Sequence, residues 1–487
     1  MNPFFTVACI TTCVDDEDAL AIASMCPQTS RVPAATRDVD GASDAPVLWS
    51  PQIDPRRRVW PYAQAQRGKT VTGQHLYGKQ TELGVENFGP GRRRASDVPM
   101  LIKNYGLVKE AAAEANRKLG VISGSQAQAI EQAAHEVAQG LHNEQFPTAL
   151  VVGGGGTTTN MNVNEVIAAR ASEIAGTLIH PNDHVNASQS TNDSYPTAMA
   201  LTVLDLAEAP IRALDDLALA FDSKADEYDQ TIRLGRTCLQ DAVTLTVGET
   251  HRSHSAAIRR TTSQLRTAVS ALTEIPLGAT VLGSGIGAAS GYRREAVAQL
   301  SKLTGRELAP SPDMFDALAN LDPYARIAHA GARTALTMAK IAQDLRVLSS
   351  GPLAGIEEVM LPATQAGSSI MPGKINPVIP EYVMQLSYRI RGTSSTVEMA
   401  AAAGELELNI MEPIIIDSLI DIFDDLKSAA TIFADKCIKG LTWDGSRLQA
   451  NASAAFDRWI KKSSEVGYEE TTREVTEYWT NAKHDIP

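Results

Sequence analysis

Side chains suited to acid-base chemistry are concentrated in residues 367–381, which read GSSIMPGKINPVIPE. Two glycines bracket a serine pair that begins with Ser368, and three prolines stiffen the residues that follow. Lys374 and Asn376 lie between prolines, and Pro380 stands where the first turn of a helix would begin. A cation, an amide and a helix N-terminus can converge there on a carboxylate. The segment predicts a loop that holds an anion beside a serine hydroxyl.

A second polar motif, GGGGTTTNMNVNEV, starts at Gly153. Its four glycines allow the backbone to come close to a ligand, and Thr157 then presents a hydroxyl at the start of a helix. A flexible surface turn would also explain the glycines. A phosphate-binding loop is disfavoured because no GK[ST] sequence follows.

A third polar motif lies within residues 180–198, HPNDHVNASQSTNDSYPTA. Ser190, Thr191 and Asn192 offer two hydroxyls and an amide just before the helix expected to follow Pro196. A Ser-Thr-Asn sequence is often only a helix cap, but capping and ligand binding can occur together at one helix end. The motif predicts a second anion site at a helix start.

These strings resemble the signature segments of the aspartase/fumarase superfamily of lyases. The resemblance covers residues 76–440, about three quarters of the chain. It implies a mainly α, three-domain aspartase/fumarase-type fold in which a long central helical bundle forms the core of a homotetramer. Each active site would be assembled from three chains, so that motifs far apart in the sequence serve one pocket.

The resemblance also implies roles for individual residues. Ser368 would be the general base, acting as an alkoxide that is stabilised by loop amides and nearby positive charge. The expected substrate-binding residues are Thr157, Ser190, Thr191, Asn192, Thr237, Cys238, Ser369, Lys374 and Asn376, with Glu381 in a supporting role and His180, Asn182 and Asp183 as an accessory anion site. We expect no cofactor and no metal ligand among them.

Removing a proton from the carbon next to a carboxylate builds charge on a group that is already negative, so donors must be in place beforehand. In the implied arrangement, Ser190, Thr191 and loop amides clamp the carboxylate that becomes an aci-carboxylate. Lys374 and Asn376 hold the other carboxylate. Thr157 and Asn192 lie near the leaving group.

The strings LQDAV from Leu239, LPATQAGSSIMP from Leu361 and AAAGELELNIMEP from Ala401 resemble aspartases. They favour a carbon–nitrogen lyase that reversibly eliminates ammonia from L-aspartate to give fumarate. Three positions depart from the pattern of the family. Cys238 stands where relatives carry His or Gln, Leu353 at a usual Arg position and Gly287 at a usual Asn position.

These departures leave other functions open. The substrate could be another 2-substituted succinate, as in a fumarase-like reaction or with a modified aspartate, or the chain could be an inactive structural tetramer of the same fold. Cys238 could act as a nucleophile, but no activating base lies beside it in the sequence, which favours a small packed cysteine.

Composition predicts a variable, disordered N-terminal extension (1–70). The resemblance implies three further regions: an N-terminal lyase domain (71–191), a central helical bundle domain (192–446) and a short, divergent C-terminal segment (447–487). We expect Ser96 to cap a long helix. A second helix should reach about Lys224 with a break near Pro210, and a third should cover residues 247–274. Residues 324–350 show the clearest helical pattern, with apolar or small residues spaced by three and four.

Charge and composition exclude several classes of function. The net charge of -13 argues against a nucleic-acid partner, and no run approaches the roughly 18 apolar residues of a membrane helix. Three of the five cysteines crowd the first 26 residues, which is no disulfide framework. The apolar start has no basic region and is followed at once by acids, which disfavours a signal peptide. We expect a cytoplasmic protein that acts on a small dicarboxylate or amino acid.

Overall fold

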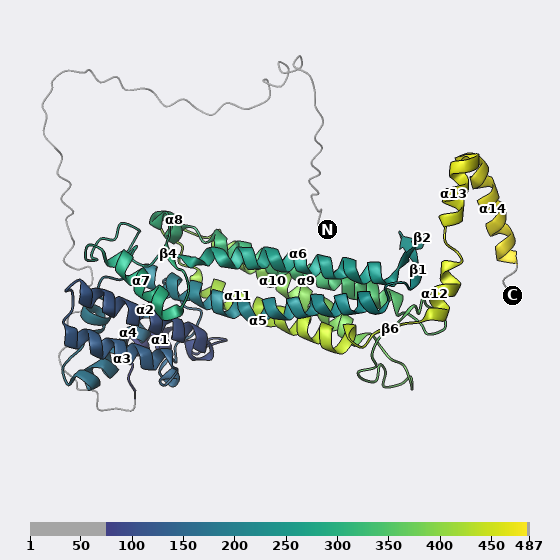
Figure 1. Ribbon diagram of the computed structural model, residues 1–487. Helices are drawn as coiled ribbons and strands as arrows, with labels where there is room; N and C mark the ends of the chain where they lie inside the picture. The colour runs from purple at the N-terminus through teal and green to yellow at the C-terminus, as the bar shows by residue number, and fades with distance from the viewer. Residues whose placement is uncertain (1–74, 485–487) are drawn as a thin grey trace, which may run out of the picture. The chain divides into compact units, whose positions relative to one another are not determined.

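Helices dominate the computed structural model, which describes residues 75–484 and confirms the mainly α fold class (Figure 1). The helices are α1 (Lys79–Phe88), α2 (Pro99–Lys118), α3 (Gly124–Ala138), α4 (Thr157–Ala175), α5 (Thr191–Glu227), α6 (Val247–Ser270), α7 (Tyr292–Thr304), α8 (Met314–Ala319), α9 (Asp322–Leu348), α10 (Val378–Ala401), α11 (Glu412–Phe433), α12 (Gly445–Ala452), α13 (Asp457–Val466) and α14 (Tyr468–His484). Short 3-10 turns (Ala95–Asp97, Asn143–Gln145, Ala271–Thr273) and π turns (Pro181–Val185, Ala434–Ile438) lie between them.

The described strands form three two-stranded sheets. β1 (Ile232–Thr237) pairs with β2 (Gln240–Thr246) in an antiparallel hairpin. β3 (Glu274–Ile275) pairs in parallel with β4 (Ala309–Pro310), and β5 (Val359–Met360) pairs antiparallel with β6 (Thr442–Trp443). Because these sheets are so small, the core is built by helix packing.

The long helices α5, α6, α9, α10 and α11 lie side by side as a bundle (Figure 1). The predicted face of α9 is confirmed, because all eight of its positions are buried: Tyr324, Ile327, Gly331, Thr334, Met338, Ile341, Leu345 and Leu348. A Cβ atom on Gly331 would lie 3.0 Å from the Ile422 side chain of α11. The small residue therefore allows the close helix approach that the spacing predicted.

Three predicted helix features are wrong: the start after Pro196, the break near Pro210 and the cap at Ser96. α5 runs unbroken from Thr191 to Glu227, so it passes through Pro210 and already begins before Pro196. Each proline removes one backbone hydrogen bond, but both are buried, and packing of α5 against α6 and α11 holds the helix together. Ser96 lies in a 3-10 turn, and α2 begins only at Pro99, whose fixed φ suits a first helical position.

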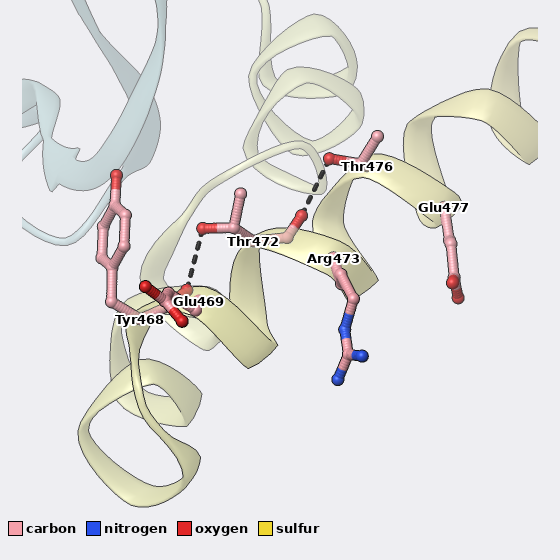
Figure 2. A pocket seen from close by; sticks show the side chains of 6 residues that line it. All are labelled: Tyr468, Glu469, Thr472, Arg473, Thr476 and Glu477. Carbon is pink, nitrogen blue, oxygen red and sulfur yellow. Dashed lines mark hydrogen bonds between the residues drawn. The ribbon is translucent and has the colours of Figure 1, made fainter.

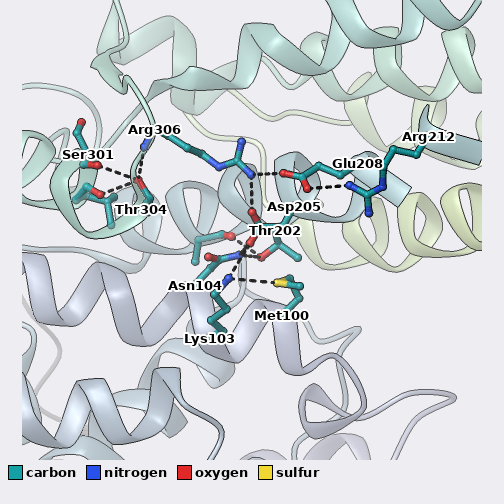
Figure 3. Close-up of polar contacts among 12 residues, drawn as sticks. Met100, Lys103, Asn104, Thr202, Asp205, Glu208, Arg212, Ser301, Thr304 and Arg306 are labelled. Carbon is teal, nitrogen blue, oxygen red and sulfur yellow. Dashed lines mark hydrogen bonds and ion pairs between the residues drawn. The ribbon is translucent and has the colours of Figure 1, made fainter. Parts of the chain in front are cut away.

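A polar network joins α2 and α7 to the start of the bundle (Figure 3). The Asp205 carboxylate of α5 accepts hydrogen bonds from Asn104 at 3.2 Å and from Arg306 at 2.7 Å, and it pairs with Lys103 at 3.4 Å. Arg306 also reaches Glu208, one turn further along α5, at 2.9 Å. The network therefore holds α2 and the segment after α7 against α5.

The C-terminal helices pack beside the β1–β2 hairpin, with α12 against β1 and α13 against β2. In α13, the Arg458 guanidinium lies 4.6 Å from the Trp459 ring centroid and 4.5 Å from that of Tyr478 in α14. Figure 2 shows a hollow on α14, and no predicted site residue lines it. Its lining residues are Tyr468, Glu469, Thr472, Arg473, Thr476 and Glu477. Among residues 75–484, no helix combines the length and apolarity needed to cross a bilayer.

The predicted division into four regions stays a prediction. The extension predicted for residues 1–70 lies outside the described residues. The predicted boundary between residues 191 and 192 falls at the first residue of α5. The predicted C-terminal segment contains α13, α14 and most of α12.

Candidate active site

The glycine motif forms a tight turn that ends at the N-terminus of α4. Gly154, Gly155 and Gly156 have φ values of 80°, 59° and 80°, a conformation that favours glycine. Thr157 is the first residue of α4, and its exposed hydroxyl donates a hydrogen bond to the Gly154 carbonyl at 2.8 Å. The predicted helix start is confirmed, and the turn holds the threonine hydroxyl at the surface.

Gly156 is also required by contact with α5, since a Cβ atom there would lie 2.1 Å from the Tyr195 ring. We expect Gly156→Ala to lower the free energy of unfolding by about 3 kcal/mol, from overpacking and left-handed backbone strain. Urea denaturation measures this loss. Gly140→Ala is the matched control, because Gly140 has a φ of 77° and open space around its Cβ position. That control should lose only about 1 kcal/mol, and equal losses would contradict the contact argument.

The Ser-Thr-Asn motif caps α5. The Ser190 hydroxyl accepts a hydrogen bond from the Asn192 N–H at 3.2 Å, and the Ser190 N–H donates to the Asp193 carboxylate at 2.8 Å. Asn192 also donates from its side chain to the Val281 carbonyl at 2.8 Å. The three predicted residues therefore lie at the first turn of α5, half-buried, where helix N–H groups favour an anion.

Asn160 brings the first two motifs together. Its side-chain amide, on α4, donates to the Thr191 hydroxyl at 3.1 Å, and its oxygen accepts from Ser194 at 3.2 Å. The same amide reaches the Asn186 oxygen at 3.3 Å. The N-termini of α4 and α5 are therefore fixed to each other within one chain.

Two buried charges support the start of α5. Lys109, on α2, donates to the side-chain oxygens of Asn186 and Gln189, each at 3.0 Å. Asp193 accepts from the N–H groups of Gly278 at 3.0 Å and Thr280 at 3.1 Å, in addition to the Ser190 N–H. Burial lowers the pKa of Lys109 to about 7, with the charge of Asp193 opposing the shift. Burial raises the pKa of Asp193 to about 6, although the hydrogen bonds from these three backbone N–H groups act to lower it.

Glu412, at the start of α11, is buried, and one of its carboxylate oxygens has no hydrogen-bond partner among the described residues. Burial raises the pKa of this carboxyl to about 8, whereas an unfolded glutamate has a pKa of about 4.3. Between these values the folded chain keeps a proton that the unfolded chain has released. The stability contribution of Glu412 therefore falls as pH rises through that window.

We expect Glu412→Gln, which resembles the protonated carboxyl, to remove this pH dependence. The slope of unfolding free energy against pH should change by up to about 1.4 kcal/mol per pH unit between pH 5 and pH 8. Urea denaturation at several pH values measures the slope. Glu407→Gln is the control, because Glu407 is exposed in the loop before α11 and should leave the slope unchanged. Parallel profiles for wild type and Glu412→Gln would contradict the prediction.

The predicted accessory anion site forms the π turn Pro181–Val185. The His180 Nδ1 atom accepts hydrogen bonds from the N–H groups of Asn182 at 3.3 Å and Asp183 at 3.1 Å. The Asp183 carboxylate lies 3.1 Å from the same nitrogen. An anion-binding role for these three residues stays a prediction.

Thr237 and Cys238 lie at the β1–β2 turn. Thr237 pairs with Gln240, which leaves Cys238 and Leu239 as a two-residue turn with φ values of 52° and 62°. The sequence favoured a packed cysteine at position 238, and the structure contradicts this, because the thiol is exposed. Burial along β1 decreases from the buried Arg233 and Leu234 to the exposed Thr237, where the hairpin turns, so the turn residues lie at the surface.

The serine loop is closed at its base by its own backbone. The Gly367 N–H donates to the Lys374 carbonyl at 2.8 Å, and the Asn376 side chain donates to the Gly367 carbonyl at 2.8 Å. A Cβ atom on Gly367 would lie 2.7 Å from both the Asn376 nitrogen and the Lys374 oxygen, so the closure requires glycine. Lys374 and Ser369 are exposed.

Within this loop, the Ser368 hydroxyl oxygen accepts hydrogen bonds from two backbone N–H groups, those of Ile370 at 3.2 Å and Met371 at 2.9 Å. Donors aimed at one oxygen favour its anionic form. Glu381, in the first turn of α10, pairs with Arg346 of α9 at 3.4 Å, which ties the end of the loop region to the bundle. The departures at Leu353 and Gly287 are both exposed.

A single chain brings these residues together in two groups. Thr157 and residues 190–192 lie at the N-terminal end of α5, whereas Thr237 follows its C-terminal end. α5 has 37 residues, so these ends are about 55 Å apart. The segment leading to Ser368 belongs to the second group, because Glu358 contacts β1. The two groups cannot form one site within one chain.

Four buried ionisable side chains were not among the predicted site residues: Lys109, Asp193, Glu358 and Glu412. Asp193 had a detectable signal, since an acid three residues after Ser190 completes a capping box. The others lie inside apolar or loop segments, and only the folded chain shows their partners.

Comparison with known proteins decides the family. A family model described as a lyase matches residues 68–392. The chain belongs to this aspartase/fumarase family of lyases. It is 40% identical to an aspartate ammonia-lyase of Pseudomonas canavaninivorans over 83% of this chain and 86% of that protein. It is 43% identical to the aspartate ammonia-lyase of Corynebacterium glutamicum over 75% of this chain and 71% of that protein. These relatives support the predicted class of carbon–nitrogen lyase.

Solved structures agree with the fold. A cobalt-bound fumarate lyase/delta crystallin of Brucella melitensis has a TM-score of 0.81 and 38% identity, and the match covers 85% of this chain and 91% of that one. A class II fumarase of Schistosoma mansoni has a TM-score of 0.79 and 32% identity, over 83% of this chain and 89% of that one. The predicted aspartase/fumarase-type fold is confirmed.

Proposed function

We propose that the chain reversibly eliminates ammonia from L-aspartate to give fumarate. The aspartate ammonia-lyases at about 40% identity over most of the chain support this substrate. The observation that carries the mechanism is the pair of N–H groups, from Ile370 and Met371, that point to the Ser368 hydroxyl oxygen.

In the proposed mechanism the Ser368 alkoxide takes a proton from C3 of aspartate. The electron pair left on C3 delocalises into the adjacent carboxylate, which becomes a dianionic aci-carboxylate. Collapse of this intermediate forms the C2–C3 double bond and breaks the bond from C2 to nitrogen, so that ammonia leaves. Two N–H donors on the serine oxygen lower the free energy of the alkoxide, which is otherwise a poor base at neutral pH.

The helix starts supply the donors that this charge requires. The first turns of α4 and α5 carry Thr157 and residues 190–192, and free N–H groups at a helix N-terminus stabilise an added negative charge. Lys374 and Asn376 lie on the serine loop and would bind the second carboxylate. These assignments give one chain both a proton-abstracting half and a carboxylate-binding half.

Because these halves lie at opposite ends of α5, the proposed site needs residues from different chains. We propose the homotetramer with three-chain active sites that the family resemblance implies. In it, the serine loop of one chain would close over the helix starts of its neighbours.

A substrate panel tests the proposal. Fumarate absorbs in the ultraviolet, so mixing the purified chain with L-aspartate should raise the ultraviolet absorbance. Fumarate and ammonia should form in equal amounts. L-malate, 3-substituted aspartates and buffer alone are the comparison arms. Turnover of malate alone would replace the proposal with a fumarase-like reaction. A lack of turnover in every arm would favour the structural tetramer.

Cys238 provides a test of the aspartase-like pocket. A thiol is a weak hydrogen-bond donor and acceptor, whereas imidazole is a good one, so Cys238→His should lower the KM for aspartate by about tenfold. Leu239→His is the matched control, since it places the same ring on the other residue of the same turn. Steady-state kinetics measure both variants. An unaltered KM in Cys238→His would count against placing this turn at the substrate.

A further inference from the structure

Glu358 is a completely buried carboxylate that no predicted role uses. Its Oε1 atom accepts hydrogen bonds from Arg236 at 2.7 Å and from the Asn451 amide at 2.8 Å. Its Oε2 atom pairs with Arg233 at 3.4 Å. Burial alone would raise the pKa of this carboxyl, but the hydrogen bonds from Arg236 and Asn451 and the charges of both arginines outweigh it, so the pKa is lowered. Glu358 is therefore a buried anion.

The donors of Glu358 come from elements far apart in the sequence. Arg233 and Arg236 are on β1, which ends at Thr237 in the proposed site. Asn451 is on α12, and the Asp444 N–H, which precedes that helix, donates to the Glu358 backbone carbonyl at 3.0 Å. The chain continues from Glu358 through β5 toward the serine loop, and Ser368 follows ten residues later.

Further contacts fix the surroundings of this carboxylate. The Glu358 N–H donates to the Leu348 carbonyl at the end of α9, at 2.9 Å. The Arg233 guanidinium lies 5.2 Å from the ring centroid of Trp443 in β6, and the Trp443 indole donates to the buried His251 of α6 at 3.0 Å. Strand β1, helix α12 and the end of α9 thus meet at Glu358, and each makes a hydrogen bond or ion pair with this residue.

We propose that Glu358 and Asn451 are positioning residues that hold the Thr237 turn and the root of the serine loop in one geometry. This makes α12, which lies beyond the segment matched by the family model, a working part of the active site. A buried ion cluster adds little net stability relative to apolar packing. Its three donors nevertheless determine where β1 and α12 lie relative to Glu358. The inference rests on the proposed function, because it assumes that both segments contact the substrate.

Asn451→Ala is the first test, since it removes one donor from Glu358 and leaves the ion pairs in place. We expect kcat for aspartate to fall about tenfold per folded tetramer, because small misplacements of reacting groups lower rate strongly. Amide hydrogen exchange should become faster in residues 232–246 and 361–376. Gln449→Ala is the matched control: it removes the same kind of side chain from an exposed position on α12 and should change neither reading.

The charge of Glu358 provides the second test. Glu358→Gln should lower kcat/KM about a hundredfold, and Glu358→Asp should restore part of that loss because it keeps the anion. Glu357→Gln is the control, as Glu357 is partly exposed and pairs only loosely with Arg447, at 3.4 Å. A purely structural role would lower thermal stability in all Glu358 variants without this recovery of rate by aspartate.

The outcomes separate the inference from the proposed function. If the wild-type chain does not convert aspartate, the proposed function fails, and hydrogen exchange alone decides whether Glu358 and Asn451 hold the two segments. If the wild type is active and Asn451→Ala keeps its full kcat, the inference is overturned. Unchanged exchange in both segments of Asn451→Ala would overturn it as well, whatever the rate.

Discussion

Ser368→Ala should lower kcat for aspartate by about 10^3-fold while the chain keeps its fold. A general base in proton abstraction contributes about 10^2-fold to 10^4-fold to the rate. The Ser368 oxygen accepts hydrogen bonds from two backbone N–H groups, and we expect the neighbouring hydroxyl of Ser369 not to replace its alkoxide. The expected loss lies in kcat more than in KM, because the hydroxyl acts on the transition state rather than on the bound carboxylates.

The matched control for this variant is Thr364→Ala, which removes another hydroxyl from the same connection between β5 and α10. Thr364 is exposed and has no assigned role, so its variant should keep wild-type kinetics. Size-exclusion chromatography and thermal unfolding of Ser368→Ala show whether its assembly is intact. Normal turnover by an intact Ser368→Ala assembly would remove Ser368 from the role of base.

The parts of the fold that local patterns determine were predictable. The buried face of α9 follows from its spacing of three and four, and the starts of α4 and α10 follow from glycine and proline placement. The predicted break at Pro210 does not occur, because packing of α5 against α6 and α11 outweighs one lost hydrogen bond. Local propensity was the weaker effect there.

The residues of the candidate site also fall into those that a short sequence string predicts and those that only the folded chain shows. Ser368, Lys374 and Asn376 were recognisable because their loop closes on itself over nine residues, so its chemistry is written in one short string. Glu358 was not recognisable, because its donors are 93 to 125 residues away in the sequence and its role exists only in the folded chain. The exposure of Cys238 likewise depends on where a hairpin turns.

The separation along α5 explains why each motif alone would be inactive. A helix start without the serine binds an anion but cannot remove a proton, and a serine loop without the helix starts has no second set of donors for the growing charge. In the proposed site, the two halves lie at opposite ends of one bundle, so assembly of several chains would be a condition for chemistry. An isolated folded subunit should therefore have no measurable lyase activity.

Subunit mixing tests this arrangement directly. Ser368→Ala and Asn192→Ala each disable one half of the proposed site, and each should be nearly inactive alone. When the two variants are co-expressed with different tags and the mixed assemblies are purified, some sites should draw an intact serine loop from one chain and an intact α5 start from another. With random assembly of equal amounts, about half of the sites receive an intact serine loop and about half receive an intact α5 start. About a quarter of the sites should therefore have both and be active.

The control pairs Ser368→Ala with Lys374→Ala. Both residues lie on the same loop of one chain, so mixing cannot produce an intact loop, and activity should stay near that of the separate variants. Recovery to about a quarter of wild-type kcat in the first mixture and none in the second would locate the two halves on different chains. No recovery in the first mixture, with mixed tetramers present, would mean that Ser368 and the α5 start do not meet across a subunit boundary. The proposed elimination would then lack its base, because the 37 residues of α5 keep these groups apart within each chain.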